Sequence, residues 1–290
     1  MIKDISIAVV GSINLDIVAT VAEFPLPGET VTNASVHRFP GGKGANQALA
    51  AHRLGASVFM VGCVGNDAVA EEALSSLKTE GVDLSYCQSL NGVSTGLALI
   101  VVNEAGENQI VVAPGANAAF VSKQLSIPKT DAIIAQLEVP QETILQATAN
   151  SSCFFCLNAA PAKPVSAALM ARADLLVVNE TEAQVLGDSL NGYQGMLAKT
   201  FGSKGAKLYK DGKEIASAKP PAINAIDTTG AGDAFTAAIT VGLVSGLSAH
   251  EALQRACITG ALTATKMGAQ SSPLLKELLA NTGQQELTSP

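Results

Sequence analysis

The stretch Asp227-Thr228-Thr229-Gly230-Ala231-Gly232-Asp233-Ala234-Phe235 decides how this chain is interpreted, because it places glycines and a carboxylate where a loop enters a helix. Glycine lets the backbone turn tightly and approach a ligand closely. The N–H groups of a first helical turn have no partners inside the helix. Together with the positive end of the helix dipole, they form an anion site. The stretch therefore predicts backbone donors for an anion where the loop becomes a helix.

Asp233 is unexpected beside an anion site, because a carboxylate repels an anion unless it has another task. Phosphoryl transfer to a hydroxyl needs both parts, namely donors that hold the phosphoryl group and a base that takes the hydroxyl proton. The alternative is an ordinary helix start with an acid in its first turn, which stabilises many helices without any catalytic role. On this stretch alone, both interpretations stay open.

Length and composition indicate one compact globular protein. The chain has 290 residues, of which 48% are hydrophobic and 15% are charged. Such a chain can bury a sizeable core. Its net charge of −7 argues against a surface that binds nucleic acid or anionic lipid through electrostatics alone. Local backbone donors can still bind a nucleotide, so we expect small-molecule ligands and neither a nucleic-acid nor a membrane partner.

The compartment is predicted from the N-terminus and the cysteines. Residues 5–11 predict a first strand and not a signal peptide, and no apolar run reaches the roughly 18 residues of a membrane span. Five cysteines, an odd number, fit a reducing cytoplasm. Cys153 and Cys156 have the spacing of a redox or zinc pair. They lie in an apolar strand-like run without a second pair, so buried structural thiols are the favoured interpretation.

Most of the chain alternates apolar strands with helices, which is typical of an α/β fold. We expect strands at 5–11, 58–62, 131–137, 153–157 and 175–178, and helices at 49–54, 68–79, 142–149 and 252–265. Two β-rich segments, at about 17–39 and 94–114, interrupt this alternation. They are predicted to pair into a small sheet beside the main body.

Polar residues follow several of these strands at their carboxyl ends, the usual ligand edge of an open α/β sheet. Asn14 and Asp16 follow the first strand and, being two apart on an extended segment, point the same way. Glu138, Asn158 and Asn179 follow three later strands. Alone, Asn14 and Asp16 are equally typical of a turn. The whole set predicts a cleft along one edge of the sheet.

A second glycine-rich loop, Gly41-Gly42-Lys43-Gly44-Ala45-Asn46-Gln47-Ala48, also leads into a helix. Lys43 and Asn46 lie where their side chains can reach a ligand held by the loop. The loop is not a P-loop, because Gly44 follows the lysine where Ser or Thr is required. Neither glycine stretch contains a full G-x-G-x-x-G. Both of these common nucleotide-binding signatures are therefore disfavoured.

Together these motifs resemble the PfkB (ribokinase-like) family of carbohydrate kinases. The resemblance rests on GSINLD at 11–16, GGKGANQA at 41–48, NETE at 179–182, DTTGAGDAF at 227–235 and GAQ at 268–270. It covers nearly the whole chain. It implies a single α/β domain over 1–290, a three-layer αβα sandwich with a mostly parallel central sheet. A small β lid would be formed by about 13–40 and 94–114, and lids would pair into a homodimer.

The resemblance also implies an activity, the transfer of the γ-phosphoryl group of ATP to a sugar hydroxyl, O5 of ribose. Asp233 would be the base, and Gly230, Ala231 and Gly232 would hold the phosphoryl oxygens. The sugar would contact Asn14, Asp16, Gly42, Lys43, Asn46 and Glu138 as well as Asp233. ATP would lie along Asn179, Thr200, Gly202, Gly205, Gly232 and Cys257.

Two kinds of metal ion are implied by the same resemblance. Glu182 would help to place Mg²⁺ through water, since magnesium keeps several waters and binds substrate phosphates. A monovalent cation, usually K⁺, would sit behind the anion loop. Its ligands would be oxygens of Asp227, Thr229, Thr263, Lys266, Gly268 and Ser272.

One departure from the family pattern concerns the nucleotide side of the cleft. Residues 187–199 are shorter than is usual and lack the expected long helix and Val/Ile-rich strand, for which 196–199 is a weak substitute. Cys257 stands where the family can carry a histidine near the adenine. The alternatives are a kinase of deoxyribose, fructose or a keto-deoxy sugar acid, and a sugar-binding protein that has lost ATP turnover. The intact Asp233 argues against the second, because a binding protein needs no base there.

Overall fold

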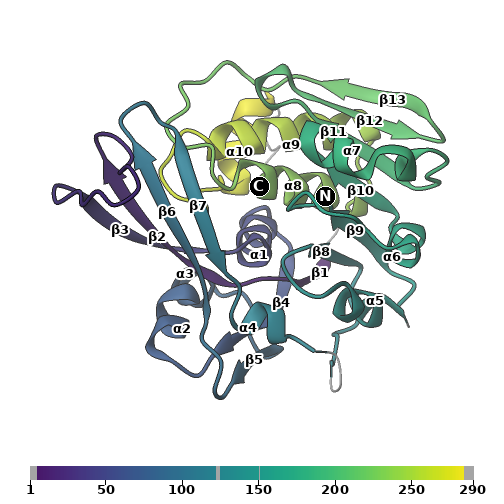
Figure 1. The fold of residues 1–290 in the computed structure, drawn as a ribbon. Helices are drawn as coiled ribbons and strands as arrows, with labels where there is room; N and C mark the ends of the chain where they lie inside the picture. The colour runs from purple at the N-terminus through teal and green to yellow at the C-terminus, as the bar shows by residue number, and fades with distance from the viewer. Residues whose placement is uncertain (1–4, 122–124, 150, 284–290) are drawn as a thin grey trace, which may run out of the picture.

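The chain folds around a nine-stranded sheet in the computed structural model, which describes residues 5–121, 125–149 and 151–283. In spatial order the strands are β13 (Lys213–Ala218), β12 (Ala206–Lys210), β11 (Met196–Thr200), β10 (Leu175–Val178), β9 (Phe154–Asn158), β8 (Ala132–Gln136), β1 (Ser6–Val10), β4 (Ser57–Gly65) and β5 (Cys87–Leu90) (Figure 1). Neighbours from β11 to β5 pair in parallel, whereas β11–β12 and β12–β13 are antiparallel. The sheet is therefore mostly parallel, as predicted.

The central strands are apolar on both faces, which explains why their sequences are unbroken apolar runs. In β1, Ile7 and Val9 pack into one core, and Ala8 and Val10 into the other. The first core is covered by α1 (Lys43–Arg53), α2 (Ala68–Ala73), α3 (Ser75–Glu80), α8 (Ala231–Val244), α9 (Ala249–Thr263) and α10 (Leu275–Thr282). The second is covered by α4 (Ala116–Ala119), α5 (Gln141–Ala149), α6 (Ala167–Arg172) and α7 (Glu180–Leu186). The predicted αβα sandwich is confirmed.

A second, four-stranded sheet projects from the main body (Figure 1). Its order is β3 (Ser35–Gly41), β2 (Asn14–Val21), β6 (Gly96–Asn103) and β7 (Asn108–Ala113). The β2–β6 pair is parallel and the two outer pairs are antiparallel. We call this sheet the lid. Its strands come from the two segments that the sequence assigns to a lid, and β2 begins four residues after β1 ends.

The structure differs from the sequence-based expectations in three places. Helix α1 begins at Lys43 and not at residue 49, because Gly42, with φ of 88°, ends the preceding loop. The helix expected over 68–79 is divided into α2 and α3. In 187–199 the structure has a short 3₁₀ turn, η2 (Gly187–Leu190). The strand is nevertheless present, because β11 pairs with β10 from Met196 to Lys199.

Within the described residues, no helix combines the length and the apolar character that a bilayer-spanning segment requires.

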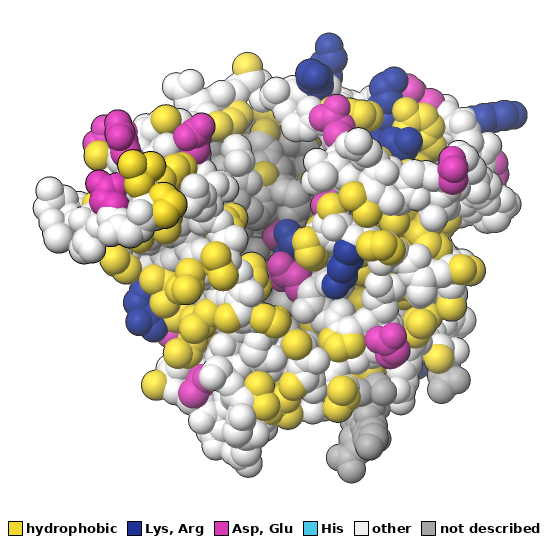
Figure 2. Space-filling view, viewed as in Figure 1, with side chains coloured by type: hydrophobic (Ala, Val, Ile, Leu, Met, Phe, Trp, Pro, Cys, Tyr) yellow, Lys and Arg dark blue, Asp and Glu magenta, His cyan; other side chains and the backbone are white. Residues whose placement is uncertain are grey.

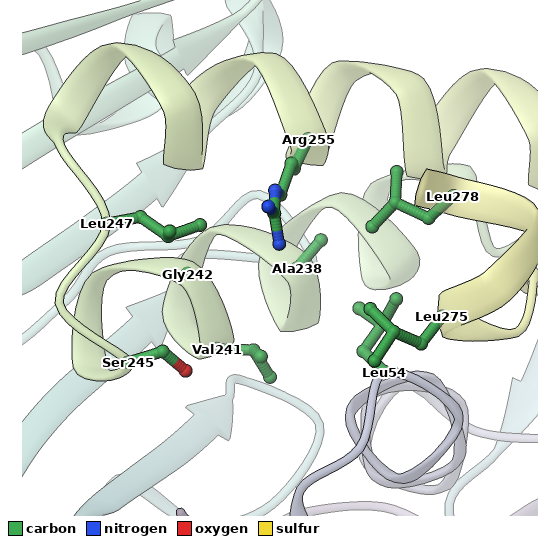
Figure 3. Close-up of a pocket in the computed structure, with 9 residues that line it drawn as sticks. All are labelled: Leu54, Ala238, Val241, Gly242, Ser245, Leu247, Arg255, Leu275 and Leu278. Atoms are coloured by element: carbon green, nitrogen blue, oxygen red, sulfur yellow. The ribbon is translucent and has the colours of Figure 1, made fainter. Parts of the chain in front are cut away.

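A cavity of about 20 Å³ lies among the helices, at the ends of α1 and α8 opposite to Lys43 and Asp233 (Figure 3). Arg255 of α9 points toward it, and leucines of α10 line it. Ser245, just beyond α8, also lines it, and its hydroxyl has no hydrogen-bond partner among the described residues. A space of this size holds about one water. We therefore interpret the cavity as a packing defect and not as a ligand site.

We predict that Ser245→Ala raises the free energy of unfolding by about 1 kcal/mol, because a buried hydroxyl without a partner costs about 1–3 kcal/mol. Ser248 supplies the matched control. Its hydroxyl accepts from the Glu251 N–H at 3.3 Å and donates to the Glu251 carboxylate at 2.6 Å, and so caps α9. Ser248→Ala should lower the same free energy by about 1 kcal/mol. Urea unfolding measures both, and equal destabilisation would contradict the prediction.

Candidate active site

The carboxyl edge of the large sheet has a topological switch point between β1 and β8. The next strand of this sheet along the chain, β4, lies on one side of β1, and β8 lies on the other side. Ligands of open α/β sheets bind at such points. Asn14 and Asp16 follow β1 here, Glu138 follows β8, Asn158 ends β9 and Asn179 follows β10. Figure 2 shows the surface hollowed between the lid and the main body, with acidic and basic side chains gathered in the hollow.

The start of α8 closes one side of this cleft. Gly230 precedes the helix with φ of 78°, and a Cβ there would lie 2.1 Å from the Ala269 carbonyl oxygen. Only glycine fits such a close approach. A Cβ on Gly232 would meet nothing within 4 Å, so open space adjoins the first turn. Among the three N–H groups predicted to hold an anion, that of Ala231 donates to the Thr228 carbonyl at 3.2 Å.

Asp233 lies in that first turn, and its carboxylate is buried at 6% exposure. Asn46 Nδ2 donates to Oδ2 and Gln47 Nε2 donates to Oδ1, each at 2.9 Å. Burial raises the pKa of Asp233, whereas the Lys43 ammonium and the two amides lower it. These three partners stabilise the ionised form, which is the form that a base requires.

Lys43 is the cation among four carboxylates. The charge of Asp233 raises the pKa of Lys43, and Glu138, Glu182 and Asp16 act in the same direction against the effect of burial. Asp16 is buried on β2, and burial together with the charges of Glu138 and Asp233 raises the pKa of Asp16 to about 7. Because one ammonium faces several acids, the site has a surplus of acceptors. Such a surplus suits a ligand with many hydroxyl donors.

Glu138 and Gly42 are fixed by the loop after β1. The Ser12 hydroxyl and the Lys43 N–H both donate to Glu138 Oε2, the latter at 3.1 Å, and the Gly44 N–H donates to the Ser12 hydroxyl at 3.3 Å. A Cβ on Gly42 would lie 2.7 Å from the Asn14 backbone nitrogen, so this glycine packs directly against the β1–β2 connection. Ser12 was not identified from the sequence, where its only signal is a polar residue after a predicted strand.

Asn117, beside the lid, is a second residue that sequence reasoning missed. Its Nδ2 donates to Asn14 Oδ1 at 2.7 Å and to the Ile13 carbonyl at 3.1 Å, and its Oδ1 accepts from the Ile13 N–H at 2.9 Å. Asn117 therefore fixes the Asn14 amide. Gln47 is the third missed residue, although it lies inside a quoted motif.

Four of the six residues predicted for ATP line the carboxyl edge from β10 to β12, and Gly232 lies in the first turn of α8. Asn179 caps α7 and exchanges hydrogen bonds with Glu182, whose carboxylate accepts from Asn179 N at 2.8 Å and Nδ2 at 3.1 Å. Thr200 ends β11, and Gly202 and Gly205 flank the turn into β12 with positive φ. Cys257 is the exception, because its thiol is buried beneath β13 and donates to the Ala218 carbonyl at 3.7 Å.

The residues predicted for a monovalent cation lie in two loops that contact each other. Asp227 Oδ1 accepts from the Thr229 N–H and Oδ2 from the Gly268 N–H, each at 2.9 Å. The Thr263 carbonyl accepts from the Lys266 N–H at 3.2 Å, and the Ser272 carbonyl accepts from an Arg53 guanidinium N–H at 2.8 Å. The available donors are carbonyl, hydroxyl and carboxylate oxygens, which suit a hard cation. No cluster of three His, Cys, Asp or Glu side chains that could hold a metal occurs in the described residues.

Both the sequence and the fold of this chain are similar to those of known proteins. A family model described as pfkB family carbohydrate kinase matches residues 4–276. The chain is 38% identical to the ribokinase of Bacillus subtilis over 284 residues, which cover 91% of this chain and 94% of that protein. Ribokinase from Thermotoga maritima superposes with a TM-score of 0.88 at 29% identity, covering 97% of this chain and 100% of that one. Arabidopsis thaliana ribokinase, solved in complex with ribose and ATP, gives 0.86 at 30% identity, with 96% and 98% covered.

The family model spans most of the chain, and the ribokinase structures share both its sandwich and its lid. The chain belongs to the pfkB family of carbohydrate kinases, phosphotransferases that act on a sugar hydroxyl.

Proposed function

We propose that this protein is a ribokinase, which transfers the γ-phosphoryl group of ATP to O5 of D-ribose and gives ribose 5-phosphate. The observation that carries the proposal is the position of Asp233, buried and ionisable, in the first turn of α8 beside open space at Gly232. The similarity to ribokinases along nearly the whole chain supports the choice of sugar.

In the proposed reaction, Asp233 takes the proton of the sugar hydroxyl as that oxygen attacks the γ-phosphorus. The bond from the γ-phosphorus to the β,γ-bridging oxygen breaks, and ADP leaves. The first-turn N–H groups at Gly230, Ala231 and Gly232 hold the phosphoryl oxygens, with the one from Ala231 released from Thr228. This is electrostatic stabilisation of charge that develops in the transition state. Lys43, next to Asp233, adds a positive charge near the same group.

The sugar would be held by Asn14, Asp16, Gly42, Lys43, Asn46 and Glu138. Asn46 Oδ1 is buried and has no hydrogen-bond partner among the described residues, so it offers an acceptor to a sugar hydroxyl. Four carboxylates around one ammonium disfavour a sugar acid, because its carboxylate would add another like charge. Deoxyribose and fructose remain the alternative substrates. A sugar-binding protein without turnover is disfavoured, because Asp233 would then be a buried charge without a task.

For the nucleotide, we propose that ATP lies along Asn179, Thr200, Gly202, Gly205 and Gly232, with Cys257 beneath this surface as packing. Mg²⁺ would enter with the phosphates. Both Glu182 oxygens already accept hydrogen bonds from Asn179, so this carboxylate fits a role through bound water better than direct coordination. The ion would neutralise charge on the phosphoryl oxygens.

We further propose a K⁺ ion behind the anion loop, on oxygens of Asp227, Thr229, Thr263, Lys266, Gly268 and Ser272. The two segments that would supply these oxygens are joined where the Gly268 N–H donates to Asp227 Oδ2, which supports the assignment. Bound there, the ion would shape the loop that precedes α8 without contacting the phosphate.

We predict that Asp233→Asn lowers kcat for ribose-dependent ADP release by roughly 10²–10⁴-fold, since a positioned general base contributes about that much. The ribose Kd, measured by calorimetry, should change little, because the remaining sugar contacts persist. Asp188→Asn, an exposed substitution in η2, is the control. Near-normal turnover of Asp233→Asn would reject the role of the base. Wild-type turnover that is faster with deoxyribose or fructose than with ribose would reject the sugar.

The second prediction concerns the cation. ADP release should be several-fold faster in KCl than in NaCl at equal ionic strength, because the larger ion fits a ring of carbonyl oxygens. Asp227→Asn should weaken the response, since it removes the one formal charge from that ring. Equal rates in the two salts would remove the cation from the proposal.

The third prediction is a homodimer through the lid. Exposed apolar side chains gather on β6 and β7 of the lid, including Leu99, Ile110, Val111 and Val112. Burying them on a second lid gains free energy, at about 25 cal/mol per Å². Sedimentation equilibrium should give twice the 29.4 kDa of one chain. The double substitution of Ile110 and Val111 by Asp, on opposite faces of β7, should give one chain. A monomeric wild type would exclude this assembly.

A further inference from the structure

Behind Asp233 lies a group of buried amides that the proposed reaction does not use. Gln47 of α1 and Gln136 of β8 are 0% exposed, and Asn158 of β9 is 7% exposed. Buried amides cost free energy unless they are hydrogen-bonded. Three of them, from three different elements, converge at the floor of the cleft. Their arrangement therefore has to be explained by the bonds that they make.

Gln47 uses every polar atom of its amide. Its Oε1 accepts from Gln136 Nε2 at 2.6 Å, and its Nε2 donates to Asp233 Oδ1 at 2.9 Å and to Asn158 Oδ1 at 3.1 Å. Two acceptors therefore lie on one side of this amide and a donor on the other. Turning the amide over would bring its oxygen against the carboxylate, so its orientation is fixed. Asn158 is fixed in turn by donating to the Val177 carbonyl at 3.4 Å.

The two oxygens of Asp233 are held by neighbouring residues with different surroundings. Asn46 holds Oδ2 and keeps its own Oδ1 without a partner in the described residues, available to the sugar. Gln47 holds Oδ1 and turns its remaining bonds toward the interior strands β8 and β9. Sugar binding can therefore rearrange Asn46, whereas both N–H groups of Gln47 are already used and its carbonyl oxygen already accepts from Gln136.

We propose that Gln47 is a positioning residue for Asp233, which fixes the rotation of its carboxylate and stabilises the ionised form that takes the sugar proton. The inference rests on the proposed kinase function and deepens it. In the transfer step, the proton moves from the sugar hydroxyl to Asp233, the new O–P bond forms and ADP leaves with the bond electrons. Gln47 touches neither substrate and acts only through the carboxylate.

The electrostatic surroundings give the direction of the effect. Burial raises the pKa of Asp233, and the hydrogen bond from Gln47 is one of the interactions that lower it. A donor to the charged form favours that form, so loss of Gln47 should raise the pKa of Asp233 further. Activity that needs the ionised base would then fall at a higher pH on the acidic side. The charged side chains that also face Asp233 are Lys43 on α1, Glu138 after β8, Asp16 on β2 and Glu182 on α7.

Gln47→Met tests the proposal, because it keeps the length of the side chain and removes its donors. The pH below which kcat/KM declines should rise by about 1 unit. That shift corresponds to the free energy of one hydrogen bond to a charged group. At a fixed pH on this acidic limb of the profile, kcat/KM should fall about 10-fold, with KM for ribose changed little. Gln136→Met is the matched control, since it is equally buried but leaves the Gln47–Asp233 bond in place. It should move the limb by less than half as much.

A second variant and a second measurement keep the test decisive. Gln47→Glu keeps the length and the bond from Gln136 but sets a like charge against Asp233, so it should move the limb further in the same direction. The Asp233 carboxyl ¹³C resonance, titrated by NMR, should show the same shifts without any substrate. Equal limbs and equal titrations for Gln47→Met and Gln136→Met would overturn the proposal and leave a structural role. A wild type without ribose-dependent ADP release would overturn the kinase function, while the NMR titration would still decide the role of Gln47.

Discussion

The site depends on keeping one carboxylate ionised inside the protein. An isolated charge there would be neutralised or would destabilise the fold. Burial raises the pKa of Asp233, and the one ammonium and two amides that α1 brings to it favour the ionised form against that effect. That requires α1 to lie against the loop after β1, and Gly44 allows this. A Cβ on Gly44 would lie 2.6 Å from the carbonyl carbon of Gly11. The glycines of the second motif therefore serve the approach of a helix as much as that of a ligand.

The excess of carboxylates over the single ammonium of Lys43 lowers the stability of the folded protein. Because burial and neighbouring charges raise the pKa of Asp16 to about 7, its ionised form is less stable in the folded protein than in the unfolded chain. Folding stability from this group is thus present at low pH and is lost as pH rises from about 4 toward 7. In the proposed complex, a sugar would relieve the same carboxylates by donating hydrogen bonds to them from its hydroxyl groups. The feature that destabilises the fold would then also be the feature that binds a polyol.

The sequence was sufficient for the elements whose reasons are local. Apolar runs predicted the buried strands, and the two glycine loops predicted close backbone approach at Gly42 and Gly230. It was insufficient where partners are distant, because Gln47 lies 186 residues from Asp233 and Asn117 lies 103 from Asn14. Strand β11 also forms although its own residues give only a weak strand pattern. It forms because β10 and β12 flank it with backbone partners, so tertiary context overrides a weak local pattern.

Helix α1 connects the two ends of the proposed mechanism. Its first turns hold Lys43, Asn46 and Gln47, and Arg53 in its last turn donates to the carbonyls of Gln270 and Ser272 at 2.8 Å each. The same guanidinium pairs with Glu80 of α3, so it is anchored on both sides. A helix of 11 residues transmits position with little deformation, because its backbone groups are bonded within it. The oxygens proposed for K⁺ and the donors that orient Asp233 are therefore held in one frame. An ion that shapes the loop at Gly268 needs no contact with the phosphate to matter for the base.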